Sequence, residues 1–211
     1  MDSSPHNSSD AKLILASTSR YRRAQLETLN IPFDCVAPNI DESATENELS
    51  TALAERLSIQ KAKAISILHP EALVIGSDQV AELRNPDGST SQFGKSLSVE
   101  RAIGQLKRFS GNTVTFYTGL AIIRQSTNHL FSAVDTVTVK FRRLTDEQIT
   151  RYVAIEMPLD CAGSFKCEGL GIRLFESIES SDPNSLIGLP LIKTIEGLLS
   201  FGYDPLFHQN Q

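Results

Sequence analysis

Polar residues suited to phosphate chemistry follow two short apolar runs of this chain. Ser17, Ser19 and Arg22 come directly after the first run, and Asp78 comes after the second. Hydroxyls, the amides of a helix start and a guanidinium are groups that bind phosphate oxygens. A carboxylate suits a divalent cation or a water molecule instead. Together the two clusters indicate a hydrolase of phosphate esters.

The two apolar runs, at residues 12–16 and 73–75, are typical of buried strands. In open α/β sheets, ligands bind beyond the carboxyl ends of such strands, so the two polar clusters are expected to meet there. Each cluster also has a plain structural interpretation. Ser19 can cap the following helix while Arg22 is solvated, and Asp78 can fix a turn by accepting loop amides.

Two lysines and an acidic pair are further candidates. Lys61 interrupts the apolar stripe of a helix predicted for residues 46–68. A lysine at such a position either extends its amine to solvent or meets an anion. Asp41 and Glu42 are adjacent acids in a loop, which are usually solvated but can add a second carboxylate to a cation site. Lys95 follows a predicted hairpin and can bring another positive charge to a phosphate.

The composition is that of an ordinary globular protein, with 40% hydrophobic and 21% charged residues among 211. The formal net charge of −5 argues against a nucleic-acid partner, because binding to a phosphate backbone needs clustered Lys and Arg. No apolar stretch approaches the roughly 18 residues of a membrane helix, so no membrane partner is expected. Residues 1–10 are polar and are predicted to be a disordered tail before a single domain at residues 11–211.

The cysteines Cys35, Cys161 and Cys167 are odd in number and lack the spacing of a zinc site. We expect them to be free thiols in a reducing compartment, which predicts a cytoplasmic location. The chain also lacks a Walker loop, a dinucleotide-binding fingerprint and an ordered Ser-His-Asp set. These absences exclude several common classes of nucleotide and ester enzymes.

Periodicity, caps and turn residues predict an α/β fold, with a mixed twisted sheet, flanking helices and two lobes around a central cleft. Two β-branched stretches, at residues 113–124 and 130–143, should pair antiparallel. The segment 161–175 is rich in glycine and is predicted to be extended and interrupted. The other strands are predicted at residues 13–16, 33–37, 73–82 and 91–93, and the helices at residues 20–29, 46–68, 99–109, 145–157 and 189–199.

A series of short motifs runs along almost the whole chain. They are Leu13-Ile-Leu-Ala-Ser17-Thr-Ser19 with Arg22, Asp41-Glu42, Lys61-Ala62, Gly76-Ser-Asp78, Gly94-Lys95, Ser110-Gly111, Phe116-Tyr-Thr-Gly119, Ala162-Gly163-Ser-Phe-Lys166, Glu168-Gly169 and Gly188-Leu-Pro190. In this order and spacing the set resembles the Maf-type nucleoside triphosphate pyrophosphatases. Each motif is short, but the set is specific, and the resemblance covers about residues 12–199.

That family hydrolyses nucleoside triphosphates to monophosphates and diphosphate with a divalent cation. The resemblance therefore implies a small nucleotide as partner and Mg²⁺ or Mn²⁺ as cofactor. It implies that Asp78 is the proton acceptor and that Glu42 supports the metal together with Asp78. The polar and cationic groups that match the surroundings of the triphosphate are Ser17, Ser19, Arg22, Lys61 and Lys95. A homodimer is expected at the level of the family.

Tyr21, Gln79 and Glu168 stand at three positions that this family associates with base selection. The glutamine after the catalytic aspartate and the later glutamate resemble the branch that hydrolyses 7-methyl-GTP. Methylation at N7 gives guanine a delocalised positive charge, which an aromatic face at Tyr21 would attract. Glu168 can accept hydrogen bonds from the N1 and N2 edge, and Gln79 can donate to O6.

The chain departs from that branch at Tyr21, where Trp is frequent, and at Arg20 and Ser96, where Pro is usual. The alternatives are a dTTP and UTP pyrophosphatase of the same family, a hydrolase of another phosphate ester, and a nucleotide-binding regulator without turnover. A regulator would not need both Asp78 and Glu42, and both are present.

Overall fold

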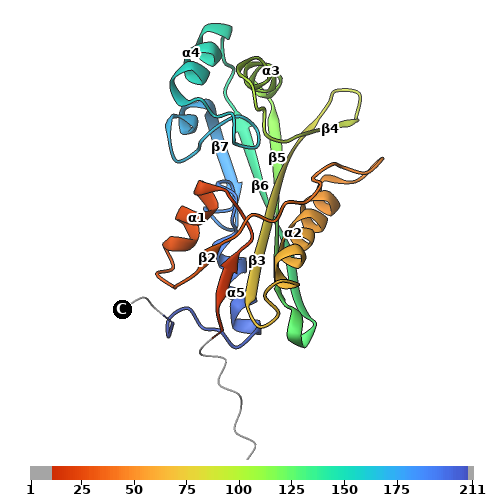
Figure 1. Cartoon of the computed structure of the whole chain (residues 1–211). Helices are drawn as coiled ribbons and strands as arrows, with labels where there is room; N and C mark the ends of the chain where they lie inside the picture. Colours follow the sequence, from red (N-terminus) through yellow and green to blue (C-terminus); the bar gives the residue numbers. More distant parts are fainter. Residues whose placement is uncertain (1–10, 209–211) are drawn as a thin grey trace, which may run out of the picture.

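The computed structural model describes residues 11–208 and has a mixed α/β architecture built on one long twisted sheet (Figure 1). The predicted tail at residues 1–10 lies outside the described residues. In chain order the elements are β1 (Leu13–Leu15), α1 (Arg20–Glu27), β2 (Asp34–Cys35), α2 (Ser50–Ser66), β3 (Leu73–Arg84), β4 (Thr90–Phe93), α3 (Val99–Phe109), β5 (Thr113–Arg124), η2 (Gln125–Thr127), β6 (His129–Phe141), α4 (Asp146–Glu156), η3 (Leu170–Leu174), β7 (Phe175–Ser180) and α5 (Leu191–Ser200).

The seven strands of the described residues follow the order β2-β1-β3-β5-β6-β7, with β4 paired to β3. β1 is parallel to both β2 and β3, and every other pairing is antiparallel. The register sets Leu13 beside Leu73 and Leu15 beside Ile75. The two apolar runs therefore end side by side, and the mixed sheet that the sequence predicts is confirmed.

The side chains of β3 alternate between the two faces of the sheet, as the strand geometry requires. Val74 packs against Ala62 and Ile65, so this face is covered by α2. Leu73 and Ile75 point the other way, toward a cluster that includes residues of α1 and α5. The even-numbered side chains of β3 thus face α2, and the odd-numbered side chains face the other side of the sheet.

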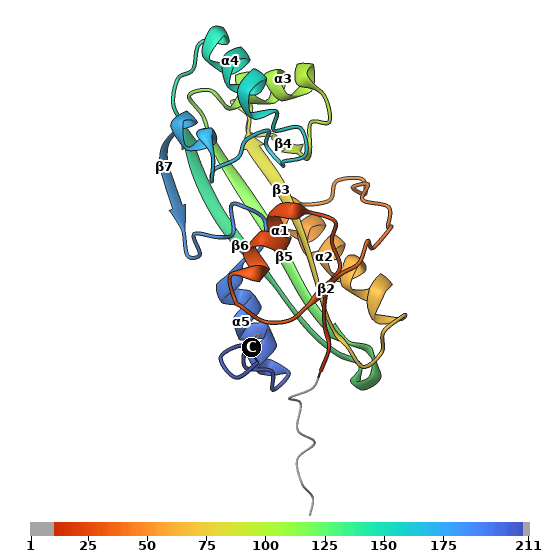
Figure 2. The same ribbon diagram turned by 60° about the vertical axis from the view of Figure 1, so that its left-hand side comes forward.

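On that opposite face the helices form two groups. α3 and α4 cover one end of the long strands, where Ala81 and Leu83 belong to their hydrophobic cluster, and α5 covers the other end (Figures 1 and 2). Ser77 and Gln79 lie on β3 between the two clusters. The strands β3, β5 and β6 pass through both ends, so the predicted two lobes share one continuous sheet.

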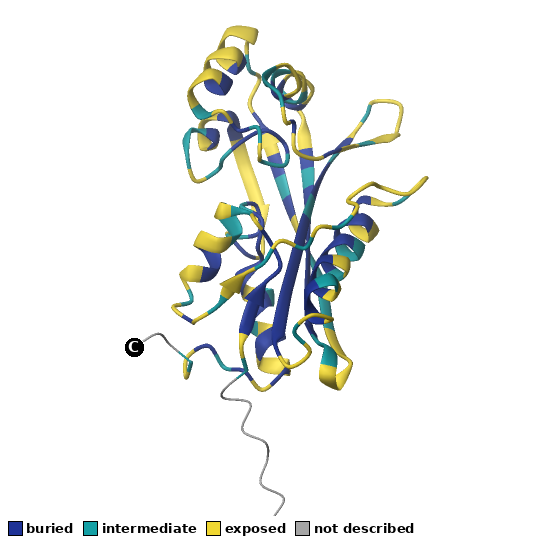
Figure 3. Cartoon of the chain, viewed as in Figure 1, coloured by how far each residue is buried: buried dark blue, intermediate teal, exposed yellow. Residues whose placement is uncertain are grey.

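Two elements differ from the sequence prediction. The helix predicted from residue 46 begins at Ser50, because Asn47 has a positive φ of 57° that a right-handed helix does not accept. β7 was not predicted, because five of its six residues are exposed and its single neighbour in the sheet is β6 (Figure 3). An edge strand of this kind carries little hydrophobic alternation in its sequence. Across residues 11–208, no helix combines the length and the apolar character of a membrane span.

Candidate active site

The site is built at a gap in the edge of β3. β1 pairs with residues 73–75 of that edge and β4 pairs with residues 81–84, whereas β5 occupies the other edge throughout. Among the described residues 11–208, no strand therefore lies beside residues 76–80 on the β1 side. At such a gap, side chains from both faces of a strand can reach one cavity, which Asp78 and Gln79 do.

Asp78 projects from β3 toward α2 and is 7% exposed. Its Oδ1 lies 2.6 Å from the Nζ of Lys61, which is 4% exposed. The same ammonium lies 3.0 Å from Oε1 of Glu42. Lys61 thus meets two carboxylates and does not extend to solvent, which settles the alternatives for its place in the stripe. Asp78 holds a buried ion pair, and its interpretation as a turn-fixing acid does not fit.

Two glycines allow α2 to lie close enough for this pairing. A Cβ added at Gly76 would come within 2.2 Å of the Ser58 carbonyl oxygen, and one at Gly119 within 2.1 Å of the Ala54 carbonyl oxygen. The helix backbone therefore rests directly on β3 and β5. Lys61 lies one turn beyond Ser58, so this close contact sets the distance between its amine and Asp78.

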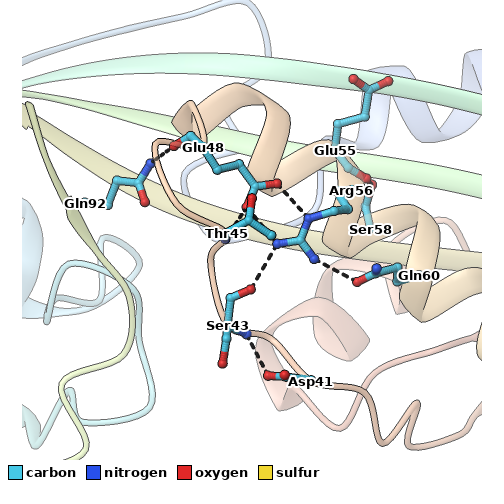
Figure 4. Close-up of polar contacts among 9 residues, drawn as sticks. All are labelled: Asp41, Ser43, Thr45, Glu48, Glu55, Arg56, Ser58, Gln60 and Gln92. Atoms are coloured by element: carbon cyan, nitrogen blue, oxygen red, sulfur yellow. Dashed lines mark hydrogen bonds and ion pairs between the residues drawn. The ribbon is translucent and has the colours of Figure 1, made fainter.

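The loop that carries Glu42 is fixed to α2 by Arg56 (Figure 4). The guanidinium donates from Nε to Glu48 Oε1 at 2.6 Å and from Nη2 to Glu48 Oε2 at 2.8 Å, a bidentate pair. Nη2 also donates to the Ser43 carbonyl at 3.0 Å. The Arg56 hydrogen bonds and the Thr45 amide lower the pKa of Glu48 to about 2. Arg56 thus clamps the loop at Ser43 and at Glu48, and Ser43 is the residue directly after Glu42.

The start of α1 forms one side of the cavity, with Ser19, Tyr21 and Arg22 among its lining residues. Ser19 caps the helix by accepting from the Arg22 amide, so its predicted capping role is confirmed. Arg22 is half-buried, and its Nε donates to the Gly188 carbonyl at 2.8 Å, so its guanidinium is held by the protein rather than free in solvent. Burial lowers the pKa of Arg22, while Asp78 and Glu42 oppose that effect. Its two Nη groups remain for a ligand beside the helix N-terminus.

These groups meet in a cavity of about 420 Å³. The predicted site residues that line it are Ser19, Tyr21, Arg22, Glu42, Asp78, Gln79, Lys95 and Glu168. Ser17 and Lys61 do not line it. Ser17 is buried and accepts from the Ser19 amide at 3.1 Å, so it supports the turn before α1. Lys61 contacts two of the lining carboxylates, those of Asp78 and Glu42.

Gln79 has an orientation that differs from the sequence interpretation. Its Nε2 donates to Thr118 Oγ1 at 3.0 Å and to the Ser185 carbonyl at 2.9 Å. Because both acceptors belong to the protein, the amide nitrogen is engaged and Oε1 is left for a ligand. We therefore expect Gln79 to accept from a bound base, whereas donation to O6 does not fit this arrangement.

Sequence reasoning missed Asp160, Cys161 and Cys167, which also line the cavity. All three lie in the irregular segment between α4 and η3. Such a segment has no helical or strand period, so the sequence does not indicate which way its side chains point. Burial is the main cause that raises the pKa of Cys161 and of Cys167 to about 12. Both thiols thus keep their protons near neutral pH and act as weak donors.

A hard divalent cation fits the carboxylate pair. In the described part of the chain, no hydrogen bond or ion pair uses Asp78 Oδ2 or Glu42 Oε2, because Lys61 contacts the other oxygen of each. Mg²⁺ is commonly held by one or two carboxylates together with substrate phosphates and water. Residues 11–208 contain no group of three or more side chains that could hold a metal ion, so a phosphate ligand would have to complete the coordination.

Comparisons with known proteins agree with the motifs. The family model described as Maf-like protein matches residues 12–201. A protein of Colwellia psychrerythraea named 7-methyl-GTP pyrophosphatase is 46% identical over 94% of this chain and 97% of its own. One of the same name from Aromatoleum aromaticum is 48% identical over 86% and 91%. The solved structure of the Staphylococcus aureus Ham1 protein has a TM-score of 0.48 at 14% identity, covering 90% of this chain and 99% of that one.

Proposed function

The chain belongs to the Maf family, and on this premise we propose that it is a pyrophosphatase that hydrolyses 7-methyl-GTP to 7-methyl-GMP and diphosphate. Two relatives at 46% and 48% identity carry the name of that activity over most of their length. The observation that carries the proposal is the buried Lys61–Asp78 pair, whose Asp78 lines the same cavity as Arg22 and the start of α1. A carboxylate and a phosphate-binding helix start then act on one ligand.

The cationic groups bind the phosphates. Arg22 presents its two Nη groups because Gly188 already engages Nε. Lys95 lines the cavity from the end of the β3–β4 hairpin, next to its bridge with Ala162. The free amides at the start of α1 favour negative charge in the same space. These groups stabilise the charge that develops on the transferred and leaving phosphates.

Asp78 performs the proton transfer. Water attacks the α-phosphorus, a new P–O bond forms, and the bond from that phosphorus to the bridging oxygen breaks, so diphosphate leaves with that oxygen. The proton of the water goes to the Asp78 carboxylate, which Lys61 holds through Oδ1 at 2.6 Å. Lys61 thereby positions the carboxylate. A divalent cation held by Glu42 together with Asp78 would polarise the phosphate oxygens when bound.

The base end of the cavity supports a cationic base. Glu168 adds a carboxylate, Tyr21 adds an aromatic ring, and Gln79 presents an acceptor oxygen. Guanine offers donors at N1 and N2, which match acceptors, and its N7-methyl form adds positive charge. This set favours 7-methyl-GTP over bases that lack such a donor edge, such as those of dTTP and UTP.

A cytoplasmic setting forms part of the proposal. Cys35, Cys161 and Cys167 are free thiols, which supports a reducing compartment. Removal of methylated nucleotides before their misuse would be the purpose of the reaction there.

The test is a panel of 7-methyl-GTP, GTP, dTTP and UTP hydrolysed in H₂¹⁸O, with the products followed by phosphorus NMR. We expect 7-methyl-GTP to have the highest kcat/KM and the heavy oxygen to appear in 7-methyl-GMP. Nucleoside diphosphate with orthophosphate would overturn the bond assignment. A clear preference for dTTP or UTP would overturn the base assignment. Omitting Mg²⁺ and Mn²⁺ should abolish turnover, and full activity with a chelator present would contradict the metal proposal.

A further inference from the structure

Tyr21 takes part in a polar cluster at the mouth of the cavity. Its hydroxyl donates to Asp160 Oδ1 at 3.2 Å and accepts from Arg20 Nη2 at 2.7 Å. The Arg20 guanidinium also lies over the Tyr21 ring, with Cζ 4.8 Å from the ring centroid. Arg20 and Asp160 form an ion pair at 3.6 Å. The Tyr21 side chain therefore contacts one cation through its ring and one carboxylate through its hydroxyl.

The cluster joins two walls of the cavity. Tyr21 comes from the first turn of α1, and Asp160 comes from the segment after α4, 139 residues away. In both views of the ribbon, α4 lies at the top of the molecule and α1 lies near its middle (Figures 1 and 2). Tyr21, Asp160 and Glu168 all line the cavity, whereas Arg20 contacts the ring from outside the set of lining residues.

We propose that Asp160 is a further determinant of base selectivity, which favours a positively charged base through Tyr21 and through its own charge, and that Arg20 opposes this preference. The inference rests on the proposed function, since it concerns the base end of the same site. Asp160 is a positioning residue for Tyr21, and Glu168 remains the acceptor for the base edge.

The charges at this end of the cavity support the assignment. Asp160 and Glu168 both place carboxylates at the cavity wall, while Arg20 is a single counter-charge outside it. Asp160 Oδ1 also accepts from the Cys161 thiol at 3.6 Å, and that thiol contributes no positive charge. A neutral base gains little from the excess negative charge, whereas a delocalised cation gains from both carboxylates.

The state of the Tyr21 ring supports it as well. A phenol that donates to a carboxylate becomes richer in electrons, so its face attracts a cation more strongly. Arg20 weakens the attraction of the ring for a second cation, because its guanidinium already lies over the ring and donates to the hydroxyl. Guanidinium and N7-methylguanine are both planar, delocalised cations with N–H donors, so they compete for the same contact with the face of this ring.

The experiment measures kcat/KM for 7-methyl-GTP and for GTP in four single variants and in the wild type. Asp160→Asn keeps the size of the side chain and removes its charge. We expect it to lower the ratio of the two values about two- to fivefold, the range of exposed charge and cation–π contributions. Arg20→Gln should raise the ratio by a similar factor. The side chains of Arg20 and Asp160 are 69% and 51% exposed, so folding should tolerate both changes.

The controls remove the same charges elsewhere. Asp34 lies on β2, pairs with Lys12 and has a side chain of similar exposure, 58%, so Asp34→Asn removes a comparable carboxylate. Arg23→Gln removes a cation from the same helix as Arg20. Both controls should leave the ratio unchanged. Equal loss of both activities in Asp160→Asn would indicate a merely structural contact and would overturn the inference. An unchanged ratio in that variant would overturn it too.

A binding measurement separates this inference from the proposed function. Calorimetric titration with 7-methyl-GMP and GMP reports base selectivity without turnover. If the wild type fails to hydrolyse 7-methyl-GTP in preference to GTP, the proposed function is wrong, yet Asp160→Asn must still weaken 7-methyl-GMP binding more than GMP binding. If it weakens both equally while the wild type prefers 7-methyl-GTP, the proposed function stands and the role of Asp160 is overturned.

Discussion

At the scale of single residues, substitution of Asp78 tests whether its carboxylate accepts the proton during turnover. Asp78→Asn keeps the shape and the contact with Lys61 but cannot accept the proton, so we expect turnover to fall about 10²-fold or more. The measurement is kcat on 7-methyl-GTP, with circular dichroism to confirm folding. Asp87→Asn, in the exposed β3–β4 turn, is the control and should keep full activity. Near-normal turnover in folded Asp78→Asn would contradict the assigned role.

The ion pairs of Lys61 reverse the stability change that the apolar stripe alone would predict for its substitution. From the apolar stripe alone, Lys61→Met should be neutral or stabilising, because the stripe becomes continuous. In the structure its ammonium pairs with Asp78 and Glu42, and the Asp78 side chain is 10% exposed. Removing one member of a buried ion pair leaves the other uncompensated, which costs about 3–5 kcal/mol. Urea unfolding at neutral pH measures the change.

The double variant Lys61→Met with Asp78→Asn provides the control for that prediction. It removes the buried negative charge together with its partner, so we expect it to recover part of the lost unfolding free energy. A single variant as stable as the wild type would show that the ion pair contributes nothing to folding.

At the scale of elements, the packing of α2 on β3 depends on a missing side chain. Gly76→Ala would place a methyl group 2.2 Å from the Ser58 carbonyl and 2.7 Å from the Ala62 amide nitrogen. Both are backbone atoms, so the helix must shift, and overpacking of this kind costs about 1–3 kcal/mol. Because Lys61 moves with the helix, we expect kcat to fall as well. Thermal unfolding and steady-state kinetics measure the two effects.

Gly104→Ala is the matched control, since a Cβ at this position in α3 meets nothing within 4 Å. It should stabilise the chain by up to about 1 kcal/mol, because alanine favours a helix more than glycine does. If Gly76→Ala behaved like Gly104→Ala, the close contact between α2 and β3 would not be what places Lys61.

The clamp between α2 and the loop of Glu42 predicts a pH dependence. The pKa of Glu48 is about 2 in the folded chain against an ordinary value of 4.5. A carboxyl group with a lowered pKa stabilises the fold fully above pH 4.5, and that contribution is lost as the pH falls toward 2. We expect Glu48→Gln to unfold at lower urea concentration at neutral pH and to lose less stability than the wild type on acidification.

Two measurements complete this test. Urea midpoints of the wild type and of Glu48→Gln should converge as the pH falls below the ordinary value of 4.5. Glu27→Gln, which removes the carboxylate of an exposed i,i+4 pair with Arg23, should change little at either pH. A constant gap between wild type and Glu48→Gln at every pH would mean that the ionised carboxylate is not what the clamp needs.

At the scale of the whole molecule, one sheet joins two groups of helices. β3 contributes Leu73 and Ile75 to the cluster at one end and Ala81 and Leu83 to the cluster at the other. Since the same strand passes through both, unfolding one end should disrupt the other. We therefore predict a single cooperative transition in calorimetry, with equal calorimetric and van't Hoff enthalpies. Two resolved transitions would instead indicate two domains.

The sequence by itself determined the elements and the chemistry they carry. Apolar runs and caps located β1, β3 and most helices, because burial and capping leave local signals in residue order. The same reasoning selected Asp78 and Arg22, since each lies within a few residues of the strand end that it follows, whereas Glu168 was selected by the resemblance to the Maf-type family. The polar residues after both runs indicated that the two clusters meet at one edge of the sheet, whereas the parallel register of β1 and β3 came from the structure.

The tertiary structure alone decided how those residues are used. Whether Lys61 meets solvent or an anion depends on the distance between α2 and β3, which two glycines far apart in the chain set through backbone contact. The orientation of Gln79 depends on carbonyls of residues 185–186, and the place of Asp160 depends on Tyr21, 139 residues away. Such long-range contacts leave no periodic pattern in a sequence, because periodicity records only which face of its own element a residue occupies.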